Sequence, residues 1–96
     1  MDFKNKRYIS KGIDSRVPPL TQLFLWQCID TLDIAKDYLQ VFNCSMYDSM
    51  QKITHIQEQP EYKKEYLFKT DTPVFVGKIF AIDDGHHSTM LLAEEY

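Results

Sequence analysis

The sequence predicts an α+β domain in which one main helix packs on a mostly antiparallel sheet of about five to six short strands, forming two layers. A length of 96 residues fits a single domain, residues 1–96, because two cores of half that size would be hard to stabilise. The contents of 44% hydrophobic and 14% aromatic residues are typical of a packed globule. One helix-like segment precedes several segments rich in strand-forming residues, which indicates the α+β class.

The main helix is expected at about residues 19–32. Pro18 and Pro19 stand at its start, where the missing N–H of proline needs no partner. On a helical wheel, six side chains cover about half of the circumference and form the predicted core face. They are Leu20, Phe24, Leu25, Cys28, Ile29 and Leu32. We expect this face to lie flat on the sheet.

Leu23 and Trp26 fall outside this core face, beside the polar Gln27 and Asp30. Two large apolar side chains on a face exposed to water require a cover. The cover is either another part of this chain or a second molecule, and the sequence leaves both open. In the second case, Leu23, Trp26, Gln27 and Asp30 form a surface that binds a protein partner.

Six segments rich in β-branched and aromatic residues are candidate strands. They cover residues 8–13, 38–44, 51–57, 64–69, 74–83 and 88–92, with turn signals at Asp48-Ser49, Pro60, Asp71-Thr72-Pro73 and Asp84-Gly85. Short turns predict that consecutive strands pair antiparallel. One helix covers one face of such a sheet, so the other face meets solvent or a second subunit. The sequence therefore leaves homodimerisation open.

Several classes of function are disfavoured by composition. No apolar run reaches the roughly 20 residues that span a bilayer, and the charged start lacks the apolar stretch of a signal peptide, so we expect a cytoplasmic protein without membrane contact. Cys28 and Cys44 are interpreted as reduced, buried side chains. The first 16 residues are basic, but no wider basic patch follows, so nucleic-acid binding is not favoured.

Polar residues near the second half of the chain suggest one candidate ligand site. It comprises His55, Gln57, Glu58, Asp84 and His87, whose imidazole and carboxylate groups could bind a small ligand or act as acid and base. The favoured interpretation is an exposed Asp-Gly hairpin and a structural hydrogen-bond network. Adjacent strand residues such as His86 and His87 point to opposite faces, so no metal site or cofactor is predicted. No nucleophile elbow or phosphate-binding glycine loop is present, which favours a non-enzymatic protein.

Motifs along most of the chain carry a family resemblance. They include Arg7-Tyr8, Leu25-Trp26-Gln27, residues 37–42, residues 60–63, Ile82-Asp83-Asp84-Gly85 and residues 87–92 with Glu94-Glu95-Tyr96. With these motifs the sequence resembles the domain of unknown function numbered 960, a family of Gram-positive bacteria and their phages and mobile elements. The resemblance implies one full-length domain and no named activity. Its presence in phages suggests an inhibitor of a host immune or regulatory complex.

The sequence thus leads to two hypotheses. The first is a small, non-enzymatic binding protein that acts through protein–protein contact. The alternative is a nucleotide- or metal-binding domain or a hydrolase, with its site near His55, Asp84 and His87.

Overall fold

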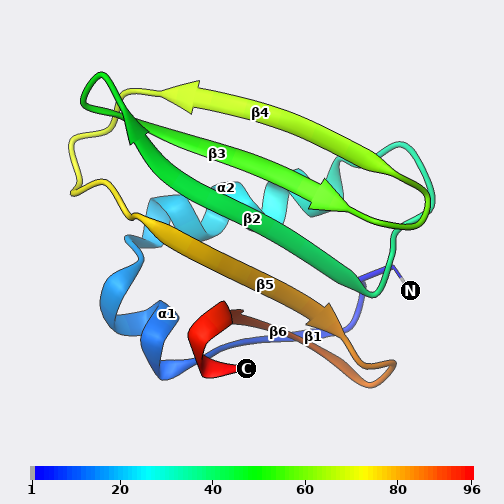
Figure 1. Cartoon of the computed structure of the whole chain (residues 1–96). Helices are drawn as coiled ribbons and strands as arrows, with labels where there is room; N and C mark the ends of the chain where they lie inside the picture. The colour runs from blue at the N-terminus through cyan, green and yellow to red at the C-terminus, as the bar shows by residue number, and fades with distance from the viewer. Residues whose placement is uncertain (1) are drawn as a thin grey trace.

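The computed structural model of the chain describes residues 2–96 and shows a six-stranded sheet with its helices on one side (Figure 1). The strands are β1 (Lys6–Ile9), β2 (Leu39–Tyr47), β3 (Met50–Gln57), β4 (Tyr62–Phe68), β5 (Gly77–Asp83) and β6 (His87–Leu92). The helices are α1 (Lys11–Arg16) and α2 (Pro19–Asp30), and a 3-10 turn, η1 (Ala93–Glu95), ends the chain. The α+β class is confirmed. Within the described residues, no helix combines the length and apolar character needed to cross a membrane.

The strands lie in the order β1-β6-β5-β2-β3-β4. All neighbours are antiparallel except β1 and β6, which are parallel, so the sheet is mixed. The expectation that consecutive strands pair is wrong at two points, because β1 pairs with β6 and not with β2, and β5 pairs with β2 and not with β4. The two middle strands, β5 and β2, carry the fully buried Ile79, Ala81 and Phe42, whereas β4 is charged and suits an edge.

The N-terminal region differs from the prediction of a strand at residues 8–13. Strand β1 ends at Ile9, and Ser10 begins helix α1 by accepting a hydrogen bond from the Ile13 N–H at 3.2 Å. The Glu95 carboxylate accepts hydrogen bonds from the Ser10 hydroxyl at 2.6 Å and the Gly12 N–H at 3.0 Å. A side chain from the other end of the sequence therefore stabilises the start of this helix, which local strand propensity cannot reveal.

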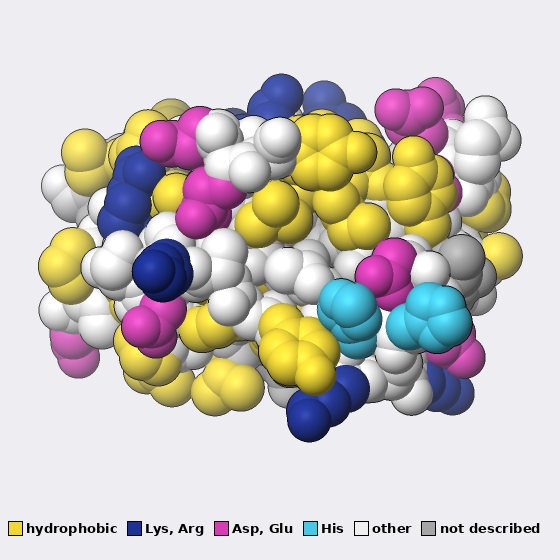
Figure 2. Space-filling model, turned by 90° about the horizontal axis from the view of Figure 1, so that it is seen from below, with side chains coloured by type: hydrophobic (Ala, Val, Ile, Leu, Met, Phe, Trp, Pro, Cys, Tyr) yellow, Lys and Arg dark blue, Asp and Glu magenta, His cyan; other side chains and the backbone are white. Residues whose placement is uncertain are grey.

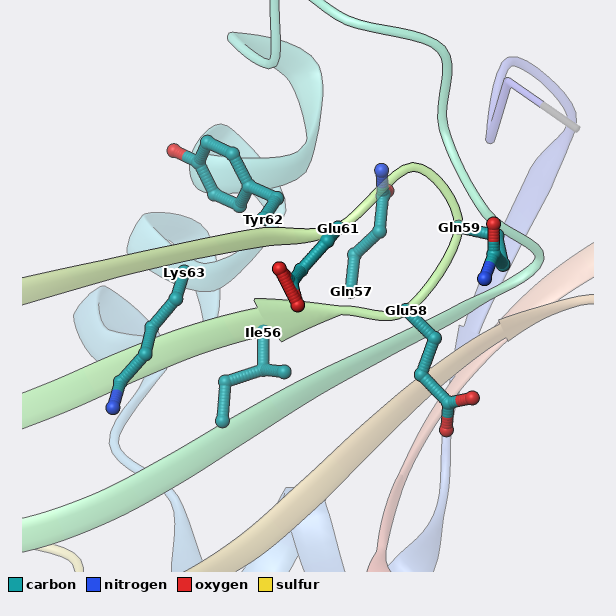
Figure 3. Close-up of a pocket in the computed structure, with 7 residues that line it drawn as sticks. All are labelled: Ile56, Gln57, Glu58, Gln59, Glu61, Tyr62 and Lys63. Atoms are coloured by element: carbon teal, nitrogen blue, oxygen red, sulfur yellow. The ribbon is translucent and has the colours of Figure 1, made fainter.

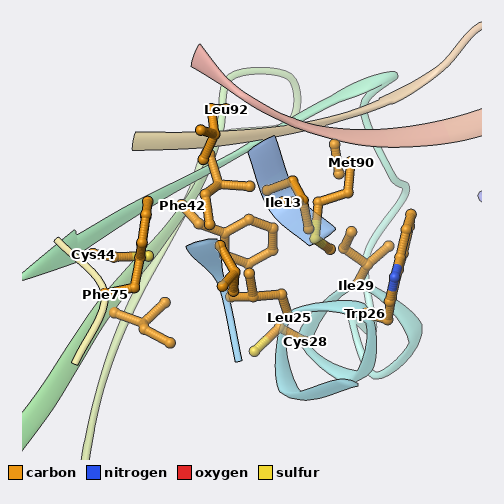
Figure 4. Packing of buried hydrophobic residues seen from close by; sticks show 14 of the residues in the cluster. Ile13, Leu25, Trp26, Cys28, Ile29, Phe42, Cys44, Phe75, Met90 and Leu92 are labelled. Carbon is orange, nitrogen blue, oxygen red and sulfur yellow. The ribbon is translucent and has the colours of Figure 1, made fainter. Parts of the chain in front are cut away.

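Helix α2 is rotated relative to the predicted core face. Its buried residues are Thr21, Leu25, Trp26, Cys28 and Ile29. Leu20, predicted to be in the core, is 70% exposed, because the rotation turns it outward to the side of the helix that carries Leu23 and Gln27. Phe24 is half-buried and packs edge-on against Tyr66 of β4, with ring centroids 5.1 Å apart. Figure 4 shows the side chains of α2 meeting those of the sheet and α1 in one core.

The β2–β3 turn consists of Asp48 and Ser49, as the sequence predicts. Tyr47 pairs with Met50, and both turn residues have positive φ, 50° and 65°. This backbone favours Asn-Gly, since L side chains with a Cβ are strained there. We expect the double variant Asp48→Asn, Ser49→Gly to raise the free energy of unfolding by about 1 kcal/mol, measured by urea denaturation. Gly85 has positive φ already, so Gly85→Ala is the matched control and should destabilise.

Candidate binding surfaces

The outer face of α2 carries a shallow depression of about 660 Å³. It contains all four residues predicted to bind a partner, together with three others. The lining residues are Arg7, Leu20, Leu23, Phe24, Trp26, Gln27 and Asp30, which we call the helix patch. Leu20 and Leu23 are 70% and 64% exposed, so the patch presents two leucine side chains to the surroundings.

Trp26 is covered by the chain itself and is only 9% exposed. The guanidinium of Arg7 in β1 lies 4.6 Å from the centre of the indole ring, within the range of a cation–π contact. Arg7 also forms an ion pair with Asp30 at the end of α2 and donates to the Phe3 carbonyl at 3.1 Å. Of the two kinds of cover that the sequence leaves open, Trp26 therefore has the intramolecular one. Leu23 stays 64% exposed among the described residues.

His55 lies fully buried on the helix-covered face of β3. Its ring stacks on Phe42 with centroids 4.6 Å apart and meets the Tyr62 ring edge-on at 5.3 Å. The Nε2 atom lies 2.6 Å from Oε1 of Gln40. Gln40 Nε2 donates to Gln57 Oε1 at 2.7 Å, and Gln57 Nε2 donates to the carbonyls of Ala35 and Pro60. Hydrogen bonds through Gln40 thus connect His55 with Gln57.

The network fixes the protonation state of His55. Gln40 uses its amide group as donor, so its Oε1 is an acceptor and His55 Nε2 must carry the proton. The Nδ1 atom is then an unprotonated acceptor, buried without a partner among the described residues. Burial disfavours the charged imidazolium and lowers the pKa of His55 from 6.5 to about 4. His55 is thus a neutral structural side chain at neutral pH.

Asp84 and His87 lie in the exposed β5–β6 hairpin, far along the sheet from His55. The Asp84 carboxylate accepts hydrogen bonds from the N–H groups of His86 and His87, both at 2.9 Å, and these donors lower its pKa. His87 Nε2 lies 3.3 Å from Asp84 Oδ2, and the ring meets Tyr8 edge-on at 5.2 Å. Figure 2 shows the two exposed histidine side chains close together, with hydrophobic side chains beside them.

Gln57 and Glu58 line a second depression, of about 620 Å³, at the β3–β4 turn. Figure 3 shows that its side chains point in different directions: Tyr62 and Gln57 to one side of the ribbon, Ile56, Glu58 and Lys63 to the other. The amide of Gln57 is already bonded within the network, and Glu58 is exposed. This arrangement offers no convergent set of polar groups.

The five residues of the candidate ligand site therefore do not converge on one point. His55 and Gln57 are buried on the covered face, whereas His87 must point to the other face because its neighbour Ser88 is buried on the covered one. In the part of the chain that is described, no three His, Cys, Asp or Glu residues are placed to hold a metal ion.

Among the described residues, no α-helix covers the face of the sheet opposite α2 (Figure 1), although the Tyr96 ring meets Phe80 edge-on with centroids 5.8 Å apart. Along four strands, half-buried side chains that point to this face alternate with buried side chains that point to the covered face. They are Leu39 and Val41 of β2, Ile56 of β3, Phe80 and Ile82 of β5 and Leu91 of β6. We call these six residues the open sheet face. Leucine, isoleucine, valine and phenylalanine are among the residues that are most often fully buried in proteins.

The sequence did not identify Arg7, Leu20 and Phe24 as parts of the helix patch. Arg7 is 23 residues from Asp30 in the chain, so no local pattern reveals their ion pair. Leu20 fits the apolar period of the helix, but the observed rotation of α2 places it on the outward side with Leu23. Asp83 was also missed: it is a buried carboxylate that accepts from Phe3 N, Asn5 Nδ2 and Gly85 N, and its pKa is lowered despite the opposing effect of burial.

Two comparisons with known proteins give a match. A family model described as staphylococcal protein of unknown function (DUF960) matches residues 6–95. A crystal structure of a protein of unknown function from Enterococcus faecalis is similar over 100% of this chain and 96% of its own chain, with a TM-score of 0.85 and 27% sequence identity. No curated protein matches the sequence. These similarities extend over the whole fold and carry no description of an activity.

Proposed function

The chain belongs to the family described as staphylococcal protein of unknown function (DUF960), as its sequence resemblance indicated, and from its surface we propose that it is a non-enzymatic protein-binding domain. The binding surface in this proposal is the helix patch. The observation that carries it is the exposure of Leu20 and Leu23 in one depression with the Arg7–Asp30 ion pair.

The composition of the helix patch supports binding of a protein. Apolar side chains at its centre would be removed from water by a partner, which contributes about 25 cal/mol for each Å² of apolar surface buried. Arginine is enriched among residues that dominate binding energy in interfaces, and here Arg7 is held in place by its contact with the Trp26 ring and its ion pair with Asp30. A side chain that is already fixed loses little conformational entropy when the partner binds.

A more specific form of the proposal is that the partner belongs to a host immune or regulatory complex, which the protein inhibits. This form rests on what the sequence resemblance implies, a family shared by Gram-positive bacteria and their phages, and no contact within the protein selects such a partner. Identification of the bound protein would decide it.

The test is capture of a partner from a Gram-positive bacterial lysate by immobilised protein, with bound proteins identified by mass spectrometry. We expect Leu23→Glu to abolish a specific capture seen with the wild type, because it places a charge in the centre of the apolar surface. The matched control is Leu67→Glu, at an exposed leucine of β4, which should leave capture unchanged. Equal capture by Leu23→Glu and the wild type, with both proteins folded, would exclude the helix patch.

A further inference from the structure

The open sheet face has two apolar rows that run across neighbouring strands. In the first row, Leu91, Phe80, Val41 and Ile56 are direct cross-strand partners on β6, β5, β2 and β3. In the adjacent row, Leu39 of β2 pairs with Ile82 of β5. Such a row of directly paired apolar side chains is typical of the inner face of a sandwich of two sheets, whereas a solvated face usually carries polar residues.

On β5, charged side chains of opposite sign flank these two rows. On β5, Asp84 follows Ile82, and Lys78 precedes Phe80, so an acidic group lies beyond one row and a basic group beyond the other. On the β4 side, Glu61 follows the end of the Leu39 row, and Lys63 pairs with Ile56 within the other row. Glu65 lies on the Lys78 side of that row, where it forms an ion pair with Lys52. Asp84, Lys78, Glu61 and Lys63 are all exposed.

This pattern is complementary to itself. A two-fold axis that lies between the two rows and across the strands places Leu39 and Ile82 of one molecule over Val41 and Phe80 of the other. The same operation places Asp84 opposite Lys78 and Glu61 opposite Lys63 of the second molecule. Isologous contacts of this kind use the same patch on both subunits, and sheets that pack face to face keep their strands nearly aligned.

We propose that the open sheet face binds a second copy of this chain, giving a dimer in which two sheets pack face to face with the helices outside. The helix patch lies on the far side of each sheet and stays accessible in this dimer (Figure 1). The inference is therefore independent of the function proposed for the helix patch.

Sedimentation equilibrium of the purified chain over a range of concentrations tests the dimer. We expect a mass that rises from that of the 11.4 kDa monomer to twice this value. Val41→Lys, at the centre of the apolar rows, should remain monomeric at every concentration. The matched control Val76→Lys changes an exposed valine outside the rows and should still dimerise. A wild-type protein that stays monomeric throughout, or a Val41→Lys protein that dimerises like the wild type, would overturn the proposal.

Charge reversal provides a second test that does not disturb the apolar rows. Lys63→Glu and Glu61→Lys should each weaken dimerisation about tenfold or more, since each puts like charges opposite one another. The double variant should regain the wild-type dissociation constant, because both contacts are then reversed together. If the double variant dimerises with the combined weakening of the two single variants, the proposed register is wrong. Leu23→Glu should leave the dimer intact, which separates this result from the test of the helix patch.

Discussion

Replacing Trp26 with alanine should lower the free energy of unfolding by about 3–5 kcal/mol. The indole is 9% exposed and belongs to the main hydrophobic core, so its removal leaves a cavity between α2 and the sheet (Figure 4). The change also removes the ring on which Arg7 stacks and leaves the guanidinium held by Asp30 and the Phe3 carbonyl. Since small domains are stable by only about 5–15 kcal/mol, this one substitution should remove a large part of the stability.

Urea denaturation followed by circular dichroism measures this effect. Leu23→Ala, three residues earlier on the same helix, is the matched control and should change the stability by less than about 1 kcal/mol, because Leu23 is mostly exposed. Arg7→Ala should give an intermediate loss, since the guanidinium covers the indole from a half-exposed position. A Trp26→Ala protein as stable as Leu23→Ala would show that the indole is not part of the core in solution.

Lowering the pH from 7 to 5 should destabilise the protein by about 2 kcal/mol through His55 alone. In the folded protein the pKa of His55 is about 4, whereas in the unfolded chain it is near 6.5. Below pH 6.5 the unfolded chain binds a proton that the folded protein does not, so stability falls as the pH falls. The loss levels off near pH 4, where the folded protein also takes up the proton. It then amounts to about 3 kcal/mol in total, because each tenfold difference in proton affinity between the folded and unfolded states is worth about 1.4 kcal/mol.

Urea denaturation at several pH values between 7 and 5 tests this prediction. His55→Phe should be less sensitive to pH in this window, whatever its stability at pH 7, because it has no group that titrates there. His86→Gln, at an exposed histidine, is the control and should keep the slope of the wild type. The buried carboxylate of Asp83 has a lowered pKa and adds its own loss only at more acidic pH, below its ordinary value of 3.8. A wild-type stability that does not change between pH 7 and 5 would contradict the neutral, buried state of His55.

The sequence by itself determined the class of the fold and most of its elements. The apolar period after Pro18-Pro19 predicted α2, and the strand-forming residues 51–57 predicted β3. Turn residues such as Asp48-Ser49 and Asp84-Gly85 predicted where hairpins close. These features are local, since a period or a turn depends on residues that are neighbours in the chain.

Only the tertiary structure decided which side of α2 is covered, which strands are neighbours and where the candidate site residues lie. Trp26 looked exposed on the helical wheel because the side chain that covers it, Arg7, comes from strand β1 and is not a neighbour of Trp26 in the sequence. The insertion of β5 beside β2 placed six apolar side chains on one uncovered face, and the opposite faces taken by His55 and His87 separated the predicted ligand site. Each of these outcomes depends on contacts between residues distant in sequence, which a local pattern does not contain.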